Sequence, residues 1–446
     1  MKRGSLWRHQ DFLKLWTGET ISVFGSSISQ LAIPLVAIST LHATTFQVGA
    51  LNAVETAPFL LVALWAGVYV DRRKRRGVLI GADIGRALVL GSIPVVFWLG
   101  GMDDNSRASG LAQLYAVALV AGILTVFFDV AYQSYLPSLV DREQLAEGNS
   151  KLTTTEAAAQ LAGPGAAGLL INALKAPVAI VVDAASFLVS AFAVGLIRKP
   201  EPEVEVPEGG HNSVRKDISE GLRYVTRHPM LKKIAGCTGT SNLGSAMTNA
   251  VLVVFLVREL HYSPSLLGLV FSLGSIGFLV GSVITARVTN WLGLGRTIVL
   301  SSGLAGFATL VVPFVPADNK ALSAPLVVAS SILVGVGVPI YNIGQVSLRQ
   351  AITPTRLQGR MNASMRFIVW GTMPLGGLIG GALGGPLGLR NTMLVGAILN
   401  ASCFLWVLFS PVRTLKEIPE VEEPTGTAAV DVAEAEHPPT GAAPML

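Results

Sequence analysis

The sequence predicts an all-α membrane protein with twelve transmembrane helices arranged in two six-helix bundles. Hydrophobic residues make up 51% of its 446 residues and charged residues only 14%, against roughly 25% charged in an ordinary soluble domain. The mean hydropathy is +0.56, and the apolar residues form runs of about the ~20 residues that span a bilayer as a helix. This composition excludes a soluble globular protein of the same size.

A basic loop fixes the expected orientation of the chain. The stretch 67–76, GVYVDRRKRR, ends in five consecutive basic residues at positions 72–76, which cannot lie in hydrocarbon and so favour the cytoplasm. We expect a multi-pass protein of a bacterial inner membrane with both termini cytoplasmic. The net charge of +5 then reflects topology rather than nucleic acid. Of the 33 Lys and Arg residues, five fall on the opposite side: Arg107, Lys175, Arg258, Lys320 and Arg390.

Twelve apolar runs divide the chain into two bundles and a linker. The predicted domains are an N-terminal bundle at 1–199, a cytoplasmic linker with an amphipathic helix at 200–230, and a C-terminal bundle at 231–412. The tail at 413–446 is acidic and rich in Pro and Ala, which predicts disorder. The spans are expected near 12–40, 47–70, 77–100, 110–134, 148–172, 176–197, 231–257, 264–287, 295–316, 323–346, 359–385 and 391–410.

The two halves repeat one another. Leu41-His42 recurs as Leu260-His261, and Val48-Gly49 recurs as Leu267-Gly268 at the same step in the span order. Two repeats of six spans joined by a linker predict two bundles that rock about a site near the midplane.

Polar residues within the spans locate that site, because each is costly in lipid and must face protein or water. In the first span, Glu19, Ser22, Ser26 and Gln30 recur every three or four residues and form one stripe. Spans nine and twelve carry almost nothing polar at mid-depth and are expected to face lipid. The candidate substrate-binding residues are Gln30, Asn52, Gln160, Asn242, Asn249, Tyr341, Gln345 and Trp370.

Three carboxylates within the spans are candidates for proton coupling: Glu55, Glu156 and Asp129. Glu55 and Glu156 each lie about eight residues into their spans, which is ~12 Å deep at 1.5 Å per residue. At that depth, proton binding and substrate binding can compete. The alternative is a structural hydrogen bond to another helix.

Other charged residues in the spans favour local pairing. Asp83 and Arg86 lie three residues apart on one helix face, which predicts an ion pair. Asp129 lies nearer the cytoplasmic end and is an alternative partner for Arg86 or Arg72. Asp183 is expected to serve packing.

Two motifs carry a resemblance to a known family. Residues 67–76 match the GxxxDRxxRR signature, and residues 163–168 read GPGAAG in the fifth span. With twelve spans in two halves, residues 10–412 resemble the major facilitator superfamily. The phrases LWTGETISVFG, YLPSLVDREQLAEGNS and DAASF resemble its enterobactin-exporter and macrolide-efflux branch. The chain departs from the pattern at Ala167, at Thr285 where an acidic residue would mirror Asp71, and at Ser26 where that branch often has aspartate.

The resemblance implies a gate and a hinge. The gate residues are Gly67, Asp71, Arg72, Arg75 and Arg76. Asp71 would accept from the helix N-terminus of span eleven near Gly359 and latch the bundles on the cytoplasmic side. The alternative is a loop that only sets topology.

The hinge residues are Gly163, Pro164 and Gly168. In the superfamily's antiporters this motif biases the transporter against leak. The alternative is ordinary small-residue packing between membrane helices.

The expected function is secondary export, in which protons are exchanged for small amphiphilic or hydrophobic compounds such as antibiotics or siderophores, by alternating access. No GxxxxGK[ST] sequence occurs, which argues against ATP as the energy source. The alternatives are an importer or facilitator of a polar metabolite, a lipid-modifying membrane enzyme and a sensor. The enzyme is disfavoured because no histidine lies in a predicted span. We expect a monomer in the lipid bilayer, with no cofactor, metal or nucleic-acid partner.

Overall fold

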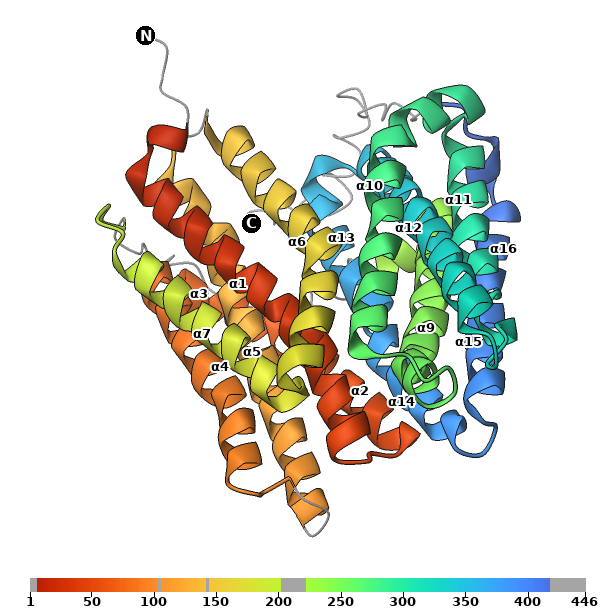
Figure 1. The fold of residues 1–446 in the computed structure, drawn as a ribbon. Helices are drawn as coiled ribbons and strands as arrows, with labels where there is room; N and C mark the ends of the chain where they lie inside the picture. The colour runs from red at the N-terminus through yellow and green to blue at the C-terminus, as the bar shows by residue number, and fades with distance from the viewer. Residues whose placement is uncertain (1–5, 103–105, 142–143, 202–221, 418–446) are drawn as a thin grey trace, which may run out of the picture.

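The computed structural model describes residues 6–102, 106–141, 144–201 and 222–417, and this part of the chain is helical without strands (Figure 1). In the first half the helices are α1 (Gln10–Leu35), α2 (Thr45–Leu61), α3 (Ala63–Asp71), α4 (Arg75–Trp98), α5 (Arg107–Leu139), α6 (Leu145–Leu174) and α7 (Ala176–Gly195). In the second half they are α9 (Pro229–Arg258), α10 (Pro264–Leu292), α11 (Leu294–Thr309), α12 (Lys320–Ala351), α13 (Thr355–Trp370), α14 (Thr372–Gly384), α15 (Leu389–Ser402) and α16 (Phe404–Leu408).

These helices form twelve membrane spans, as predicted. Within the described residues, eleven are long and apolar enough to cross a membrane. The remaining span is divided into α2 and α3 at Val62. A second break, at Gly371, separates α13 from α14. The two broken spans face each other, because α14 packs against α2.

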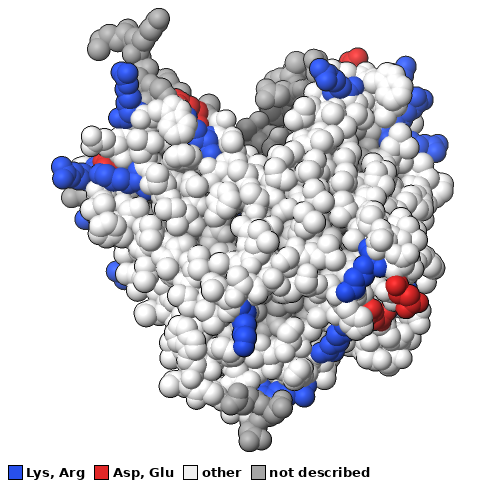
Figure 2. All heavy atoms as spheres, viewed as in Figure 1, with Lys and Arg blue, Asp and Glu red and all other residues white. Residues whose placement is uncertain are grey.

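The helices α1–α7 form one bundle and α9–α16 the other, and the bundles touch mainly at one end of the molecule (Figure 1). There α6 packs against α10 and α2 against α14. We call this the closed end. At the opposite end, which carries the loop 72–76 and is called the basic end, the surface is hollowed between the bundles (Figure 2).

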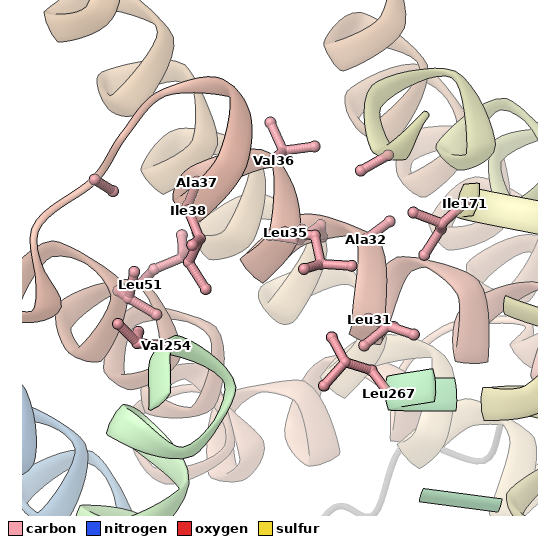
Figure 3. Packing of buried hydrophobic residues seen from close by; sticks show 14 of the residues in the cluster. Leu31, Ala32, Leu35, Val36, Ala37, Ile38, Leu51, Ile171, Val254 and Leu267 are labelled. Carbon is pink, nitrogen blue, oxygen red and sulfur yellow. The ribbon is translucent and has the colours of Figure 1, made fainter. Parts of the chain in front are cut away.

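The hydrophobic cores follow the same division. The largest cluster of buried residues is continuous across both bundles at the closed end, where Leu31 lies near Leu267 and Leu51 near Val254 (Figure 3). Two smaller clusters are each confined to one bundle: one contains Phe12 and Tyr135 and the other contains residues between Val225 and Val412. Over the ranges that the structure describes, the bundles therefore share an apolar core toward the closed end.

The internal repeat extends to the backbone. His42 and His261 both have left-handed conformations, with φ of 47° and 51°. The His42 carbonyl accepts a hydrogen bond from Arg107, and the His261 carbonyl accepts one of 2.8 Å from Lys320. The turn that follows the first span in each half is therefore built in the same way.

The chain that leaves α7 is held against the N-terminal bundle. Asp11 accepts from the backbone N–H groups of Arg198 and Lys199, at 3.2 and 3.0 Å. Glu201 accepts from the N–H groups of Arg75 and Arg76 at the start of α4, at 2.8 and 3.3 Å, which satisfies two donors that a helix N-terminus otherwise leaves free.

Parts of the predicted linker and tail lie outside the described residues, namely 202–221 and 418–446. Residues 222–227 are helical and lead into α9. The amphipathic linker helix and the disordered tail therefore remain predictions.

Candidate functional site

A cavity of about 420 Å³ lies against the inner face of the N-terminal bundle. Four helices of that bundle and one residue of α10 form its wall, so it lies where the two bundles face each other. The residues that line it are Glu19, Ser22, Val23, Ser26, Ser27, Gln30, Arg86, Thr125, Phe128, Asp129, Glu156, Ala159, Gln160, Pro164 and Ser275.

The structure brings several predicted residues together in this cavity. The whole polar stripe of the first span lines it, because residues three or four apart share one face of α1. Of the predicted substrate contacts, Gln30 and Gln160 are present, and of the predicted proton carriers, Asp129 and Glu156.

Among the described residues that line the cavity, Arg86 is the one basic residue. It forms the predicted ion pair with Asp83, and the two residues are 5% and 0% exposed. The guanidinium carbon lies 4.2 Å from the ring centroid of Phe128 and 4.1 Å from that of Phe187. One carboxylate and two aromatic faces therefore already stabilise its charge.

Glu19 is a carboxylate of the cavity that was not predicted to couple protons. Its Oε2 atom is enclosed and has no hydrogen-bond partner within the described residues. Glu19 belongs to the same stripe as Gln30, and this periodicity was the signal that could have assigned it. The cavity wall thus contains three carboxylates, Glu19, Asp129 and Glu156, and one cation, Arg86. Asp83, which does not line the cavity, neutralises this cation.

Glu55 and Asn52 do not line this cavity. Their helix α2 packs closely on α5, where a Cβ built on Gly122 would lie 2.8 Å from the Glu55 carbonyl oxygen. Asn52 lies at the contact with α14, with its Oδ1 3.5 Å from a Cβ built on Gly377.

The predicted contacts from the C-terminal bundle also lie away from the cavity. Asn242 donates to the Val369 carbonyl at 3.1 Å. Tyr341 is buried in the core of the C-terminal bundle, 2.7 Å from Thr238 through its hydroxyl. Gln345 is also buried.

Two further predicted contacts are exposed. Asn249 lies on an exposed face of α9. The Trp370 ring lies 5.9 Å from that of Phe59 in the opposite bundle.

The expectation that spans nine and twelve are almost without polar residues is wrong. Asn400 of α15 is 4% exposed; it accepts from Ser241 at 2.8 Å and donates to Thr309 of α11 at 3.3 Å. Both helices therefore bury polar groups within the C-terminal bundle, which stabilise contacts between helices.

The predicted gate lies at the basic end, where the bundles are apart. A Cβ built on Gly67 would meet no atom within 4 Å, so Gly67 makes no close helix contact in this conformation. Arg72 is exposed, and Arg76 donates to the carbonyls of Val194 and Gly195 at the end of α7. The side chain of Asp71 lies outside the part of the chain that the structure describes, so the latch remains a prediction.

The predicted hinge lies at two close helix contacts. A Cβ built on Gly163 would overlap the Ser27 side chain of α1. A Cβ built on Gly168 would lie 3.0 Å from the Cα of Gly268 on α10. These small residues allow α6 to approach a helix of its own bundle and a helix of the other.

Comparison with known proteins identifies the family of this chain. A family model described as transmembrane secretion effector matches residues 5–436. The chain belongs to this family. The transmembrane secretion effector family is part of the major facilitator superfamily, and the chain is accordingly a bacterial membrane transporter.

Similar proteins within this superfamily include two named efflux proteins. The chain is 26% identical over 381 residues to the multidrug efflux pump Tap of Mycolicibacterium fortuitum, covering 83% of this chain and 88% of that protein. It is 22% identical over 420 residues to macrolide efflux protein A of Streptococcus pyogenes, covering 93% and 99%.

A solved structure shares the fold. It is the crystal structure of a bacterial homologue of the iron transporter ferroportin in an inward-facing state. The TM-score is 0.69 at 18% identity, over 91% of this chain and 100% of that one.

Proposed function

We propose that this transporter is a proton-coupled exporter of small amphiphilic organic compounds, which it moves by alternating access. The carboxylate-rich cavity between the bundles is the observation on which the proposal depends. Two of the similar proteins are named as efflux proteins, one for macrolides and one for several drugs, which supports the same direction of transport.

The charge of the cavity favours substrates that carry a basic group. Three carboxylates line it, while the charge of Arg86 is already balanced by Asp83. A protonated amine on the substrate would pair with these carboxylates, and protons would replace it on release. Proton and substrate then compete for the same oxygens, which is the minimum that antiport requires.

The orientation follows from the basic loop. With 72–76 in the cytoplasm, both termini are cytoplasmic and the hollow between the bundles opens inward. We further propose that residues 1–199 and 231–412 act as two rocking units within a monomer, with Gly67 and Asp71 joining the bundles at the basic end when the closed end opens.

Reconstitution in liposomes with an imposed pH gradient tests this function. We expect a cationic amphiphilic dye, but not an anionic dye of similar size, to cross the membrane against a counterflow of protons. Glu19→Gln, Asp129→Asn and Glu156→Gln each remove a carboxylate that would bind both the proton and the substrate. Each should reduce this exchange at least about tenfold, which corresponds to ~1.4 kcal/mol. Glu417→Gln is the control, because Glu417 is exposed at the basic end. Unchanged coupled flux in all three cavity variants would exclude the proposal.

A further inference from the structure

A second cavity, of about 570 Å³, lies outside the central site, on the outer side of the N-terminal bundle near the basic end. Both α3 and α4 pack against α5 but hardly touch each other, so a groove runs between them with α5 as its floor. It is lined by Tyr69, Arg73, Lys74, Gly77, Val78, Gly81, Ala82, Leu124 and Phe127.

Two glycines leave the groove unfilled. Gly77 and Gly81 lie one helical turn apart on α4, and a Cβ built on either would meet no atom within 4 Å. This differs from Gly85, one turn further, where a built Cβ would lie 2.7 Å from the Leu124 side chain. The groove is therefore open along Gly77 and Gly81, beside an apolar floor that includes Leu124 and Phe127.

The mouth of the groove is basic and aromatic. Arg73 and Lys74 are exposed there, and neither forms an ion pair within the described residues. The Arg73 guanidinium lies 5.6 Å from the ring centroid of Tyr69, which in turn contacts Phe127 edge to face at 5.4 Å. The lining residues include no Asp or Glu.

Several other donors near the start of α4 are already engaged. Arg76 donates to carbonyls at the end of α7, and the backbone N–H groups of Arg75 and Arg76 bind Glu201. The N-terminus of α4 is thus capped and is not the anion site. In the part of the chain that the structure describes, Arg73 and Lys74 form no ion pair, and they lie directly above an apolar channel.

We infer that this groove binds one anionic phospholipid. Its phosphate lies between Arg73 and Lys74, and one acyl chain runs along Gly77 and Gly81 over Phe127. A basic cluster at the interface attracts anionic headgroups, and the empty channel beneath it selects a lipid over a soluble phosphate. This proposed lipid site lies on the lateral surface of the protein. Lipid binding there does not depend on which compound the central cavity transports.

The test counts lipids retained by the purified full-length protein. The protein is transferred into nanodiscs with equal phosphatidylglycerol and phosphatidylcholine and released for native mass spectrometry. We expect one phosphatidylglycerol to be retained preferentially. Arg73→Gln with Lys74→Gln should weaken this retention roughly 25-fold, from ~1 kcal/mol for each basic residue near a membrane surface. The matched control is Arg223→Gln with Arg227→Gln, which removes the same charge from two exposed residues of the basic end.

A second variant separates chain binding from headgroup binding. A Cβ at position 81 would meet no atom within 4 Å, and leucine has a better helix propensity than glycine. We therefore expect Gly81→Leu to fill the groove and keep the fold, as a thermal unfolding midpoint at or above that of the wild type would show. It should abolish retention although both basic residues remain. The inference is overturned if the wild type retains both lipids equally, if the two double variants behave alike, or if Gly81→Leu retains phosphatidylglycerol. Displacement by inorganic phosphate alone would likewise overturn it.

Discussion

Gly168 of α6 and Gly268 of α10 bring the two bundles into backbone contact, because a Cβ on either would lie 3.0 Å from the Cα of the other. Gly49 occupies the position in the first half that Gly268 occupies in the second. It makes the equivalent contact with α14, where its Cβ would lie 2.7 Å from the Cα of Gly381. The closed end is therefore sealed by two glycine contacts related by the internal repeat.

A side chain at this contact should favour separation of the closed end. Gly268→Val places three carbons where backbone atoms lie, and overpacking of this kind costs ~1–3 kcal/mol. We expect the population with a separated closed end to rise about fivefold or more and coupled transport to fall. The measurement is the distance between spin labels on Phe46→Cys and Leu387→Cys, both exposed near this end. Gly195→Val is the control, since its Cβ would meet no atom within 4 Å. Equal distance distributions would contradict the prediction.

Removing Arg86 should destabilise the N-terminal bundle. Arg86→Leu leaves the fully buried Asp83 without its ion-pair partner, and such a change typically costs ~3–5 kcal/mol. Asp83→Leu combined with Arg86→Leu removes both charges and should recover much of the loss. Thermal unfolding in detergent compares the variants. A double variant no more stable than Arg86→Leu would show that the pair is not the source of the effect.

Lys175 should be replaceable by glycine with a gain in stability. It has φ 70° and ψ 153° between α6 and α7, a conformation that is nearly confined to glycine. In the second half Gly388 has φ 78° and ψ 162° between α14 and α15. We expect Lys175→Gly to raise the free energy of unfolding by ~1 kcal/mol or more, and Gly388→Ala to lower it, as measured by chemical denaturation. A loss on Lys175→Gly would show that its side chain outweighs the backbone strain.

Stability should depend on pH through His228, which caps α9. Its Nδ1 accepts from the N–H groups of Met230 and Leu231 at 3.2 and 3.3 Å, and burial lowers its pKa below the ordinary 6.5. The unfolded chain therefore binds the proton more readily, so this contribution to stability is complete above pH 6.5 and is lost as pH falls below it. His228→Asn retains an acceptor at the cap and should remove this component. The difference between the two melting curves across pH 5–8 measures it; a flat difference would contradict the prediction.

The spans, their division into two bundles and the polar stripe of the first span could be predicted because they depend on local periodicity. A stripe such as Glu19 to Gln30 must share one face of a helix wherever that helix lies. The same periodicity does not distinguish a face that lines the central cavity from one that packs inside a bundle. For this reason Tyr341 and Asn242 were expected in the site, although they bind neighbouring helices instead.

Other features carry no periodic signal. Asn400 is a single polar residue in an apolar span, and only its partners on two other helices explain it. The separation of the bundles at the basic end also has no signal in the sequence, because in the alternating access proposed above one sequence must specify both conformations.

The hydrogen bonds of Asp11 and Glu201 fix where the connection between the halves begins. The 20 residues at 202–221 connect that anchor to the helical turn before α9. The helix contacts of the closed end are made outside this connection. A backbone cut within it would consequently leave the two fragments associated through those contacts.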